Sequence, residues 1–110
     1  MQRFAPIVTL ASILALTSTS IFAQSGDPEK GRAFGLEVCT PCHVVVEDQL
    51  SPGRLATAPD FRAIANTRGM TETSLHAFLS TPHPTMPNLI LTSAEQDDVI
   101  AYILSLRRER

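Results

Sequence analysis

The sequence has few of the residues from which a small protein builds a self-sufficient core. It contains no tryptophan, one tyrosine and five phenylalanines, and aromatic residues make up 5% of its 110 residues. Its two cysteines allow no more than one internal disulfide bond. Domains near this size usually depend on disulfide bonds, a metal or a cofactor in addition to apolar packing. The composition therefore predicts a single domain that another group helps to stabilise.

Charged residues are absent from Phe4 to Ala23, although 44% of the whole sequence is hydrophobic. This uncharged segment follows one basic residue and ends in Ser, Thr and a small residue, as secretory signal peptides do. We expect residues 1–23 to be a signal peptide and residues 24–110 to be the mature domain. Pro6 and the Ser/Thr content disfavour a membrane span, which needs roughly 20 mostly apolar residues. An uncleaved N-terminal anchor is the alternative.

The mature chain lacks a dense basic region. Cleavage after Ala23 leaves 87 residues with eight basic and eleven acidic side chains, a net charge of −3. Nucleic-acid binding requires a strongly basic face, so the composition argues against that function. The basic cluster of Arg107, Arg108 and Arg110 lies near the end of the last expected helix, where cations interact favourably with the helix dipole.

The two cysteines lie in the sequence Cys-Thr-Pro-Cys-His at residues 39–43, which is the pattern of c-type haem attachment. The thiols of Cys39 and Cys42 can add to the two vinyl groups of the porphyrin, and the two intervening residues let both thiols reach it. His43 follows directly, and its imidazole can bind the iron. The motif predicts one covalently attached haem c per chain.

Three other uses of the cysteine pair fit less well. A zinc site needs four ligands, and neither His76 nor His83 lies at a recognisable spacing from the motif. A thioredoxin-like redox pair needs a βαβ context, whereas strand patterns are few in this sequence. A disulfide between residues three apart closes a very small loop and stabilises little. A disulfide-stabilised exported protein without haem remains an open alternative.

Local signals predict the first two helices. Asp27 is a favourable N-cap before Pro28, and the first helix is expected to run from Pro28 into Cys39. A short second helix is expected to follow Pro59 over residues 60–66. Its inward side chains should be three apolar residues: Phe61, Ile64 and Ala65.

A third helix is expected after Thr71, which is a favourable N-cap. Its inward face should carry Leu75, Phe78 and Leu79, with His76 on the solvent side. A proline-rich segment follows, with three prolines between residues 82 and 87, and it cannot be helical.

The last helix has the clearest amphipathic pattern. Ser93 is expected to cap it in a capping box with Gln96 at the third helical position. Asp97 and Asp98 are expected to face solvent. Tyr102 adds an aromatic side chain to an apolar face that comprises Val99, Ile100, Ile103, Leu104 and Leu106.

Met86 is the candidate for the second axial iron ligand. A thioether is a soft ligand that can fill this position, and the flanking prolines leave the backbone little freedom to lose on binding. Met70 is a weaker candidate because it lies in a turn far from the last helix. His83 is the rival ligand, three residues from Met86.

With the motif near its start, Met86 in a proline-rich segment and a terminal helix carrying Tyr102, the sequence resembles the class I c-type cytochromes in their small bacterial monohaem form. The resemblance covers about residues 27–106. It implies an all-α cytochrome c fold of three to five helices around one covalently attached haem.

The resemblance also implies a role for individual residues. Cys39 and Cys42 match the thioether positions, His43 the proximal ligand and Met86 the distal ligand. Pro59 resembles the family proline whose carbonyl accepts a hydrogen bond from the proximal histidine.

Two glycines bear on the expected helix contact. Gly31 and Tyr102 match the family contact between the first and last helices. Gly35 departs from the family, which often has an aromatic residue there.

The function that follows is one-electron transfer and not enzymatic catalysis, since two axial ligands leave the iron no open position. The resemblance implies an exported, monomeric periplasmic carrier in a respiratory chain. It would dock transiently with a donor dehydrogenase or respiratory complex and with a terminal acceptor. Membrane association is expected only if the N-terminal segment is uncleaved. The alternative is a haem subunit or ligand sensor of a larger redox complex, with a displaceable Met86.

Overall fold

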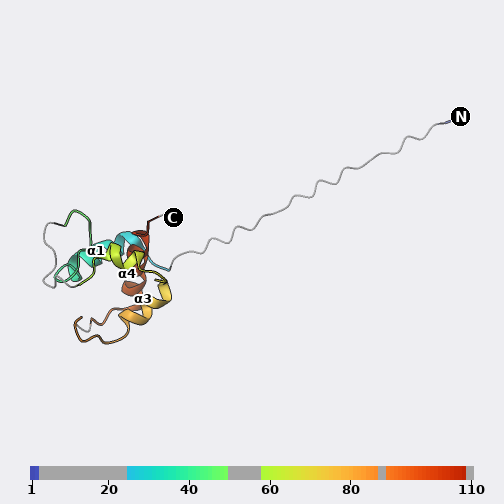
Figure 1. The fold of residues 1–110 in the computed structure, drawn as a ribbon. Helices are drawn as coiled ribbons and strands as arrows, with labels where there is room; N and C mark the ends of the chain where they lie inside the picture. Colours follow the sequence, from blue (N-terminus) through green and yellow to red (C-terminus); the bar gives the residue numbers. More distant parts are fainter. Residues whose placement is uncertain (3–24, 50–57, 87–88, 109–110) are drawn as a thin grey trace.

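The computed structural model describes residues 1–2, 25–49, 58–86 and 89–108, so residues 3–23 of the expected signal peptide lie outside the described residues. Four helices form in the order α1 (Pro28–Val38), α2 (Phe61–Asn66), α3 (Glu72–Leu79) and α4 (Ser93–Ser105). The described residues contain no strand, which confirms the expected all-α class. The other three helices all pack against α4 (Figure 1). No helix in the described ranges is long and apolar enough to span a membrane.

Two of the four predicted helix starts, at the N-caps Asp27 and Thr71, are confirmed, and α2 begins at Phe61, one residue after its predicted start. The Asp27 carboxylate accepts hydrogen bonds from the backbone N–H groups of Glu29 and Lys30, and proline occupies the first turn of α1. Asp60 caps α2, and Thr71 caps α3 in a capping box. These side chains satisfy backbone donors that have no partner inside the helix.

The prediction that Ser93 caps α4 is wrong by one residue. Thr92 is the N-cap, and its Oγ1 accepts from the Glu95 N–H at 3.3 Å. The Glu95 carboxylate accepts from the Thr92 N–H at 2.7 Å and so completes the capping box. With Thr92 as the cap, Glu95 occupies the third helical position; with Ser93 as the cap, Gln96 would occupy it. A charged carboxylate accepts hydrogen bonds from N–H groups more strongly than a neutral amide does.

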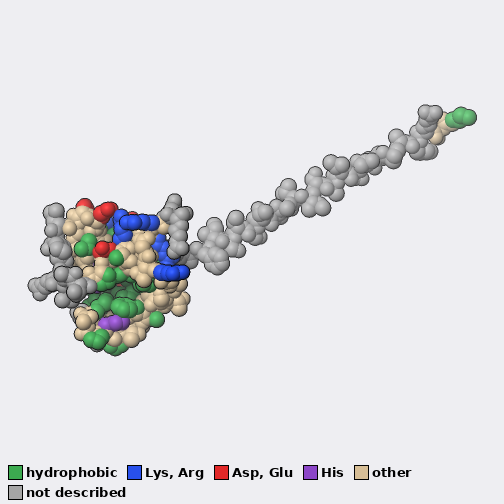
Figure 2. Space-filling model, in the orientation of Figure 1, with side chains coloured by type: hydrophobic (Ala, Val, Ile, Leu, Met, Phe, Trp, Pro, Cys, Tyr) green, Lys and Arg blue, Asp and Glu red, His purple; other side chains and the backbone are tan. Residues whose placement is uncertain are grey.

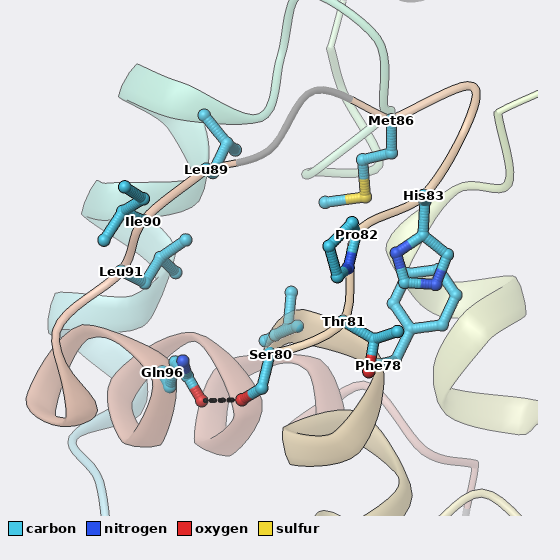
Figure 3. Close-up of a pocket in the computed structure, with 11 residues that line it drawn as sticks. Phe78, Ser80, Thr81, Pro82, His83, Met86, Leu89, Ile90, Leu91 and Gln96 are labelled. Atoms are coloured by element: carbon cyan, nitrogen blue, oxygen red, sulfur yellow. Dashed lines mark hydrogen bonds between the residues drawn. The ribbon is translucent and has the colours of Figure 1, made fainter.

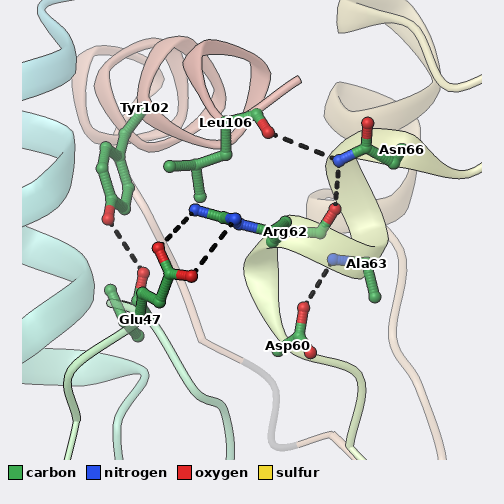
Figure 4. Close-up of polar contacts among 8 residues, drawn as sticks. Glu47, Asp60, Arg62, Ala63, Asn66, Tyr102 and Leu106 are labelled. Carbon is green, nitrogen blue, oxygen red and sulfur yellow. Dashed lines mark hydrogen bonds and ion pairs between the residues drawn. The ribbon is translucent and has the colours of Figure 1, made fainter. Parts of the chain in front are cut away.

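Close contact between α1 and α4 organises the core. A Cβ atom on Gly31 would lie 1.9 Å from the Asp98 carbonyl oxygen and 2.9 Å from the Tyr102 Cβ, so only glycine allows this approach. Tyr102 is 7% exposed, and its hydroxyl donates to the Val45 carbonyl oxygen at 2.8 Å (Figure 4). The crossing matches the contact expected of Gly31 and Tyr102.

Gly35 gives the second close approach along α1. A Cβ atom there would lie 3.0 Å from Val45 Cγ1 and 3.2 Å from Phe61 Cε2. Phe61 comes from α2 and is buried, so an aromatic ring from another helix fills the space beside this glycine. The buried apolar residues of the core are Val45, Phe61, Ala65, Leu75, Val99, Ile100, Ala101, Tyr102 and Ile103.

Four side chains are placed differently from the prediction. Asp97 and Asp98 are half-buried, not solvated, and the Asp98 carboxylate accepts from the Asp27 N–H at 2.7 Å. His76 is also half-buried, because α4 supplies partners for both of its ring nitrogens. Phe78 was expected to face inward but is 47% exposed. Helical periodicity gives the face of each residue but not the neighbours that approach it from another helix.

Candidate functional site

The Cys-x-x-Cys-His motif lies in a compact turn at the C-terminus of α1. Cys39 is the C-cap residue, and its N–H donates to the Gly35 carbonyl at 2.9 Å. The N–H groups of Cys42 and His43 both donate to the Cys39 carbonyl oxygen, at 3.1 and 2.9 Å. These bonds fold the motif back on itself, so both cysteines and the histidine follow one helix end.

Both cysteines are half-buried free thiols. Burial, with a smaller contribution from neighbouring Cys42, raises the pKa of Cys39 to about 11. The Cys39 thiol therefore keeps its proton at neutral pH in this structure. Among the described residues no three His, Cys, Asp or Glu side chains come together as a metal cluster.

His43 is oriented by a residue from the segment before α2. Its Nδ1 lies 2.7 Å from the carbonyl oxygen of Pro59, and its ring packs against Phe61 with 5.6 Å between centroids. The tautomer that donates from Nδ1 leaves the Nε2 lone pair available to bind a metal. The structure thus places His43 and Pro59 in contact, the two residues that the resemblance pairs.

Gln49 is a supporting residue that the sequence did not reveal. Its Nε2 donates to the His43 carbonyl oxygen at 3.1 Å, and its Oε1 accepts from the Val45 N–H at 2.9 Å. The amide therefore fixes the backbone that follows His43. A glutamine in an irregular segment gives no pattern from which this role could be predicted.

Met86 and His83 lie on the wall of a cavity of about 440 Å³, a volume typical of ligand sites. The His83 ring stacks on Phe78 with 3.7 Å between centroids, and the Met86 sulfur points toward Pro82 (Figure 3). The described lining residues are mainly apolar and belong to residues 78–91 and to α4: Phe78, Leu79, Ser80, Thr81, Pro82, His83, Met86, Leu89, Ile90, Leu91 and Gln96.

This cavity wall exposes apolar surface. Ile90 is 99% exposed, Phe78 is 47% exposed and Leu89 is 36% exposed. Hydrophobic side chains gather around a hollow on the face shown in Figure 2. Apolar side chains exposed together around a hollow mark a binding site for an apolar group. A porphyrin is such a group, so the residues present fit it.

The structure separates the two halves of the candidate site. Cys39, Cys42, His43 and Pro59 cluster at the end of α1 and before α2, whereas Met86 lines the cavity between α3 and α4. None of the four clustered residues is among the described residues that line the cavity.

A curated protein is similar to this chain over most of its length. Over 95 residues, the chain is 36% identical to cytochrome c-552 of Bradyrhizobium diazoefficiens (strain JCM 10833 / BCRC 13528 / IAM 13628 / NBRC 14792 / USDA 110). The match covers 86% of this chain and 89% of the relative. No protein-family profile and no solved structure matches the chain.

Proposed function

The chain belongs to the c-type cytochromes, carries covalently bound haem c and acts as an electron carrier, and we propose that His43 and Met86 ligate its iron during one-electron transfer in the periplasm. The observation that carries this proposal is the position of Met86 in an apolar cavity wall, in the same chain as the Cys-x-x-Cys-His turn. The haem supplies the ferric–ferrous couple, and the protein holds it and controls its access to water.

Cys39 and Cys42 would attach the group through two thioether bonds. Each S–H adds across one vinyl double bond, with the sulfur bonding to one carbon and the hydrogen to the other. The addition requires free thiols, and both cysteines are free. Two covalent bonds at the end of α1 would hold the group next to the core, since Cys39 packs against the cluster that includes Phe61 and Val45.

His43 would bind the iron through Nε2. The 2.7 Å contact of its Nδ1 with Pro59 sets the tautomer and the orientation of the ring. A hydrogen bond to a carbonyl also makes the ligating nitrogen more basic. Pro59 acts through its backbone oxygen, so its role is to position His43.

Met86 would fill the second axial position. The thioether favours ferrous iron and raises the potential relative to a second histidine. With both positions filled, the iron has no vacancy for oxygen or peroxide chemistry, which favours a carrier over an enzyme. Export rests on the uncharged segment of residues 4–23, with cleavage after Ala23.

The partners would be a donor dehydrogenase or respiratory complex and a terminal acceptor, each docking briefly through a small interface. Residues 77–94 contain no Asp, Glu, Lys or Arg, and most of the described cavity wall comes from this segment. Docking over the part of this segment that the haem would leave uncovered should therefore depend little on ionic strength, because salt screens charge interactions and not apolar contact.

Absorption spectra of the purified protein test the ligand assignment. Wild type should show low-spin six-coordinate iron with a methionine–iron charge-transfer band. Met86→Ala should lose the band, and the matched variant His83→Ala should keep it. A band that survives in Met86→Ala would overturn the assignment, and a band lost in both variants would indicate an indirect role for the histidine.

Two further measurements test the rest of the proposal. Reduced wild type should bind carbon monoxide slowly, because Met86 occupies the site, and ready binding would favour the ligand-sensor alternative. The intact mass of protein from the periplasmic fraction should equal that of residues 24–110 plus one haem. An uncleaved mass in the membrane fraction would contradict cleavage after Ala23 and favour the N-terminal anchor.

A further inference from the structure

A polar cluster joins α3 to α4 at the base of the segment that carries Met86. His76 Nε2 lies 3.1 Å from Asp97 Oδ1, and His76 Nδ1 lies 3.2 Å from Gln96 Oε1. Ser80, the C-cap of α3, donates from Oγ to the same Gln96 oxygen at 3.3 Å (Figure 3). We name these four residues the α3–α4 clasp.

The clasp is more protected than an ordinary surface ion pair. The side chains of His76 and Asp97 are 33% and 28% exposed, whereas those of Arg62 and Glu47, which form an ion pair elsewhere, are 44% and 78% exposed (Figure 4). Half-buried pairs are screened less by solvent and salt. Glu72 also faces the imidazole, with its Oε1 at 4.0 Å from Nε2.

The clasp fixes both ends of the Met86 segment. That segment leaves α3 after Ser80 and enters α4 at Thr92. Among its described residues, hydrogen bonds occur at these ends: Thr81 bonds back into α3, and Thr92 bonds forward to Glu95. The contact between Ser80 and Gln96 is the direct link between the two ends.

Holding the ends of a segment together reduces the conformations open to the residues between them. A weak ligand such as a thioether dissociates less readily when the backbone that carries it gains little conformational entropy on dissociation. We propose that His76 is a positioning residue for Met86: it orients Gln96 toward Ser80 and so keeps the thioether at the iron. This inference rests on the proposed ligation by His43 and Met86.

Imidazole binding to the ferric holoprotein tests the inference, because imidazole must displace Met86. His76→Leu and Gln96→Met remove donor or acceptor atoms from the clasp. Each should bind imidazole about tenfold more tightly than wild type, the size expected for a lost hydrogen bond to a charged group. Gln96→Glu keeps an oxygen that can accept from both His76 and Ser80, and its imidazole affinity should match wild type.

Two control variants separate positioning from loss of stability. Arg62→Gln removes the ion pair with Glu47, and Tyr102→Phe removes a buried hydrogen bond at the other side of α4. Both should bind imidazole as wild type does, even where urea denaturation shows that they are destabilised. If Tyr102→Phe loosens Met86 as much as His76→Leu does at equal stability, the clasp has no special role.

The outcomes also separate this inference from the proposed function. A wild type with the methionine–iron band whose imidazole affinity does not change in His76→Leu and Gln96→Met overturns the clasp alone. A wild type without that band overturns both the ligation by Met86 and the inference built on it.

Discussion

The α1–α4 crossing and the cavity wall of residues 78–91 use similar apolar side chains but cover them differently. At the crossing, Gly31 is buried and Tyr102 is 7% exposed. Along the cavity wall, Phe78 is 47% exposed and Ile90 is 99% exposed. Apolar burial contributes roughly 25 cal/mol per Å², so the wall gains little of this stabilisation from the polypeptide itself.

This difference indicates what the cofactor does for the fold. The crossing is closed by glycine, a buried tyrosine and core aliphatic residues that the chain supplies. The cavity wall has apolar side chains without enough protein to cover them, and an apolar ring can cover them instead. With His43 and Met86 as the proposed iron ligands, the haem would cover this wall and act as part of the core on one side of α4.

Removing the attachment points should have the largest effect. In Cys39→Ala/Cys42→Ala, no haem should remain with the protein after acid–acetone extraction. Amide hydrogen exchange in residues 78–91 should then lose its protection before α1 and α4 do, because those residues depend most on the ring. Equal loss of protection in both regions would contradict the claim that residues 78–91 depend on the haem more than α1 and α4 do. Haem that stays bound after extraction would contradict attachment at these cysteines.

Overpacking the crossing should have the next largest effect. In Gly31→Ala the new Cβ would meet the Asp98 backbone oxygen at 1.9 Å, and backbone cannot move aside as a flexible side chain can. We expect a loss of about 3 kcal/mol or more in the free energy of unfolding, near the upper end for overpacked cores. Urea denaturation measures it.

Gly69→Ala is the matched control for Gly31→Ala. Gly69 has φ of +78°, and no atom lies within 4 Å of the place that a Cβ would take, so alanine there suffers backbone strain without a clash. It should lose about 1–2 kcal/mol. A smaller loss in Gly31→Ala than in this control would show that the crossing is not tightly closed.

Local chemistry made part of this structure predictable. Asp27 and Thr71 were predicted as caps because capping depends on residues close in sequence. The predicted N-cap of α4 was wrong by one residue because Thr92 and Ser93 both carry hydroxyl groups that can cap a helix. The Cys-x-x-Cys-His motif was likewise readable because its chemistry fixes its spacing.

Contacts between distant segments were not predictable. His76 was assigned to solvent because its partners, Gln96 and Asp97, come from another helix. Phe78 was assigned to the core because its helical face is apolar, yet that face borders a cavity. Polar side chains have many possible partners, and only the packing of α3 on α4 selects among them.

Tyr102→Phe should weaken the crossing moderately. The substitution keeps the ring but leaves the Val45 carbonyl oxygen without the 2.8 Å hydrogen bond from the tyrosine hydroxyl. We expect a loss of about 1–2 kcal/mol in the free energy of unfolding, the usual cost of a buried unsatisfied acceptor. The methionine–iron band should not change, because Met86 lies on the other side of α4. An unchanged stability would mean that water or another donor replaces the hydroxyl.

The smallest effect should be a loss of stability at alkaline pH, caused by ionisation of Tyr102. Burial is the main cause that raises the pKa of its hydroxyl above the ordinary value of 10.0. Because the pKa is higher in the folded state, the tyrosine's contribution is complete below about pH 10 and is lost as pH rises through the folded-state value. NMR of the ring can follow this titration without overlap, since Tyr102 is the sole tyrosine. Wild type should lose more stability above pH 10 than Tyr102→Phe does, and a ring that titrates at or below pH 10 would show that the crossing admits water.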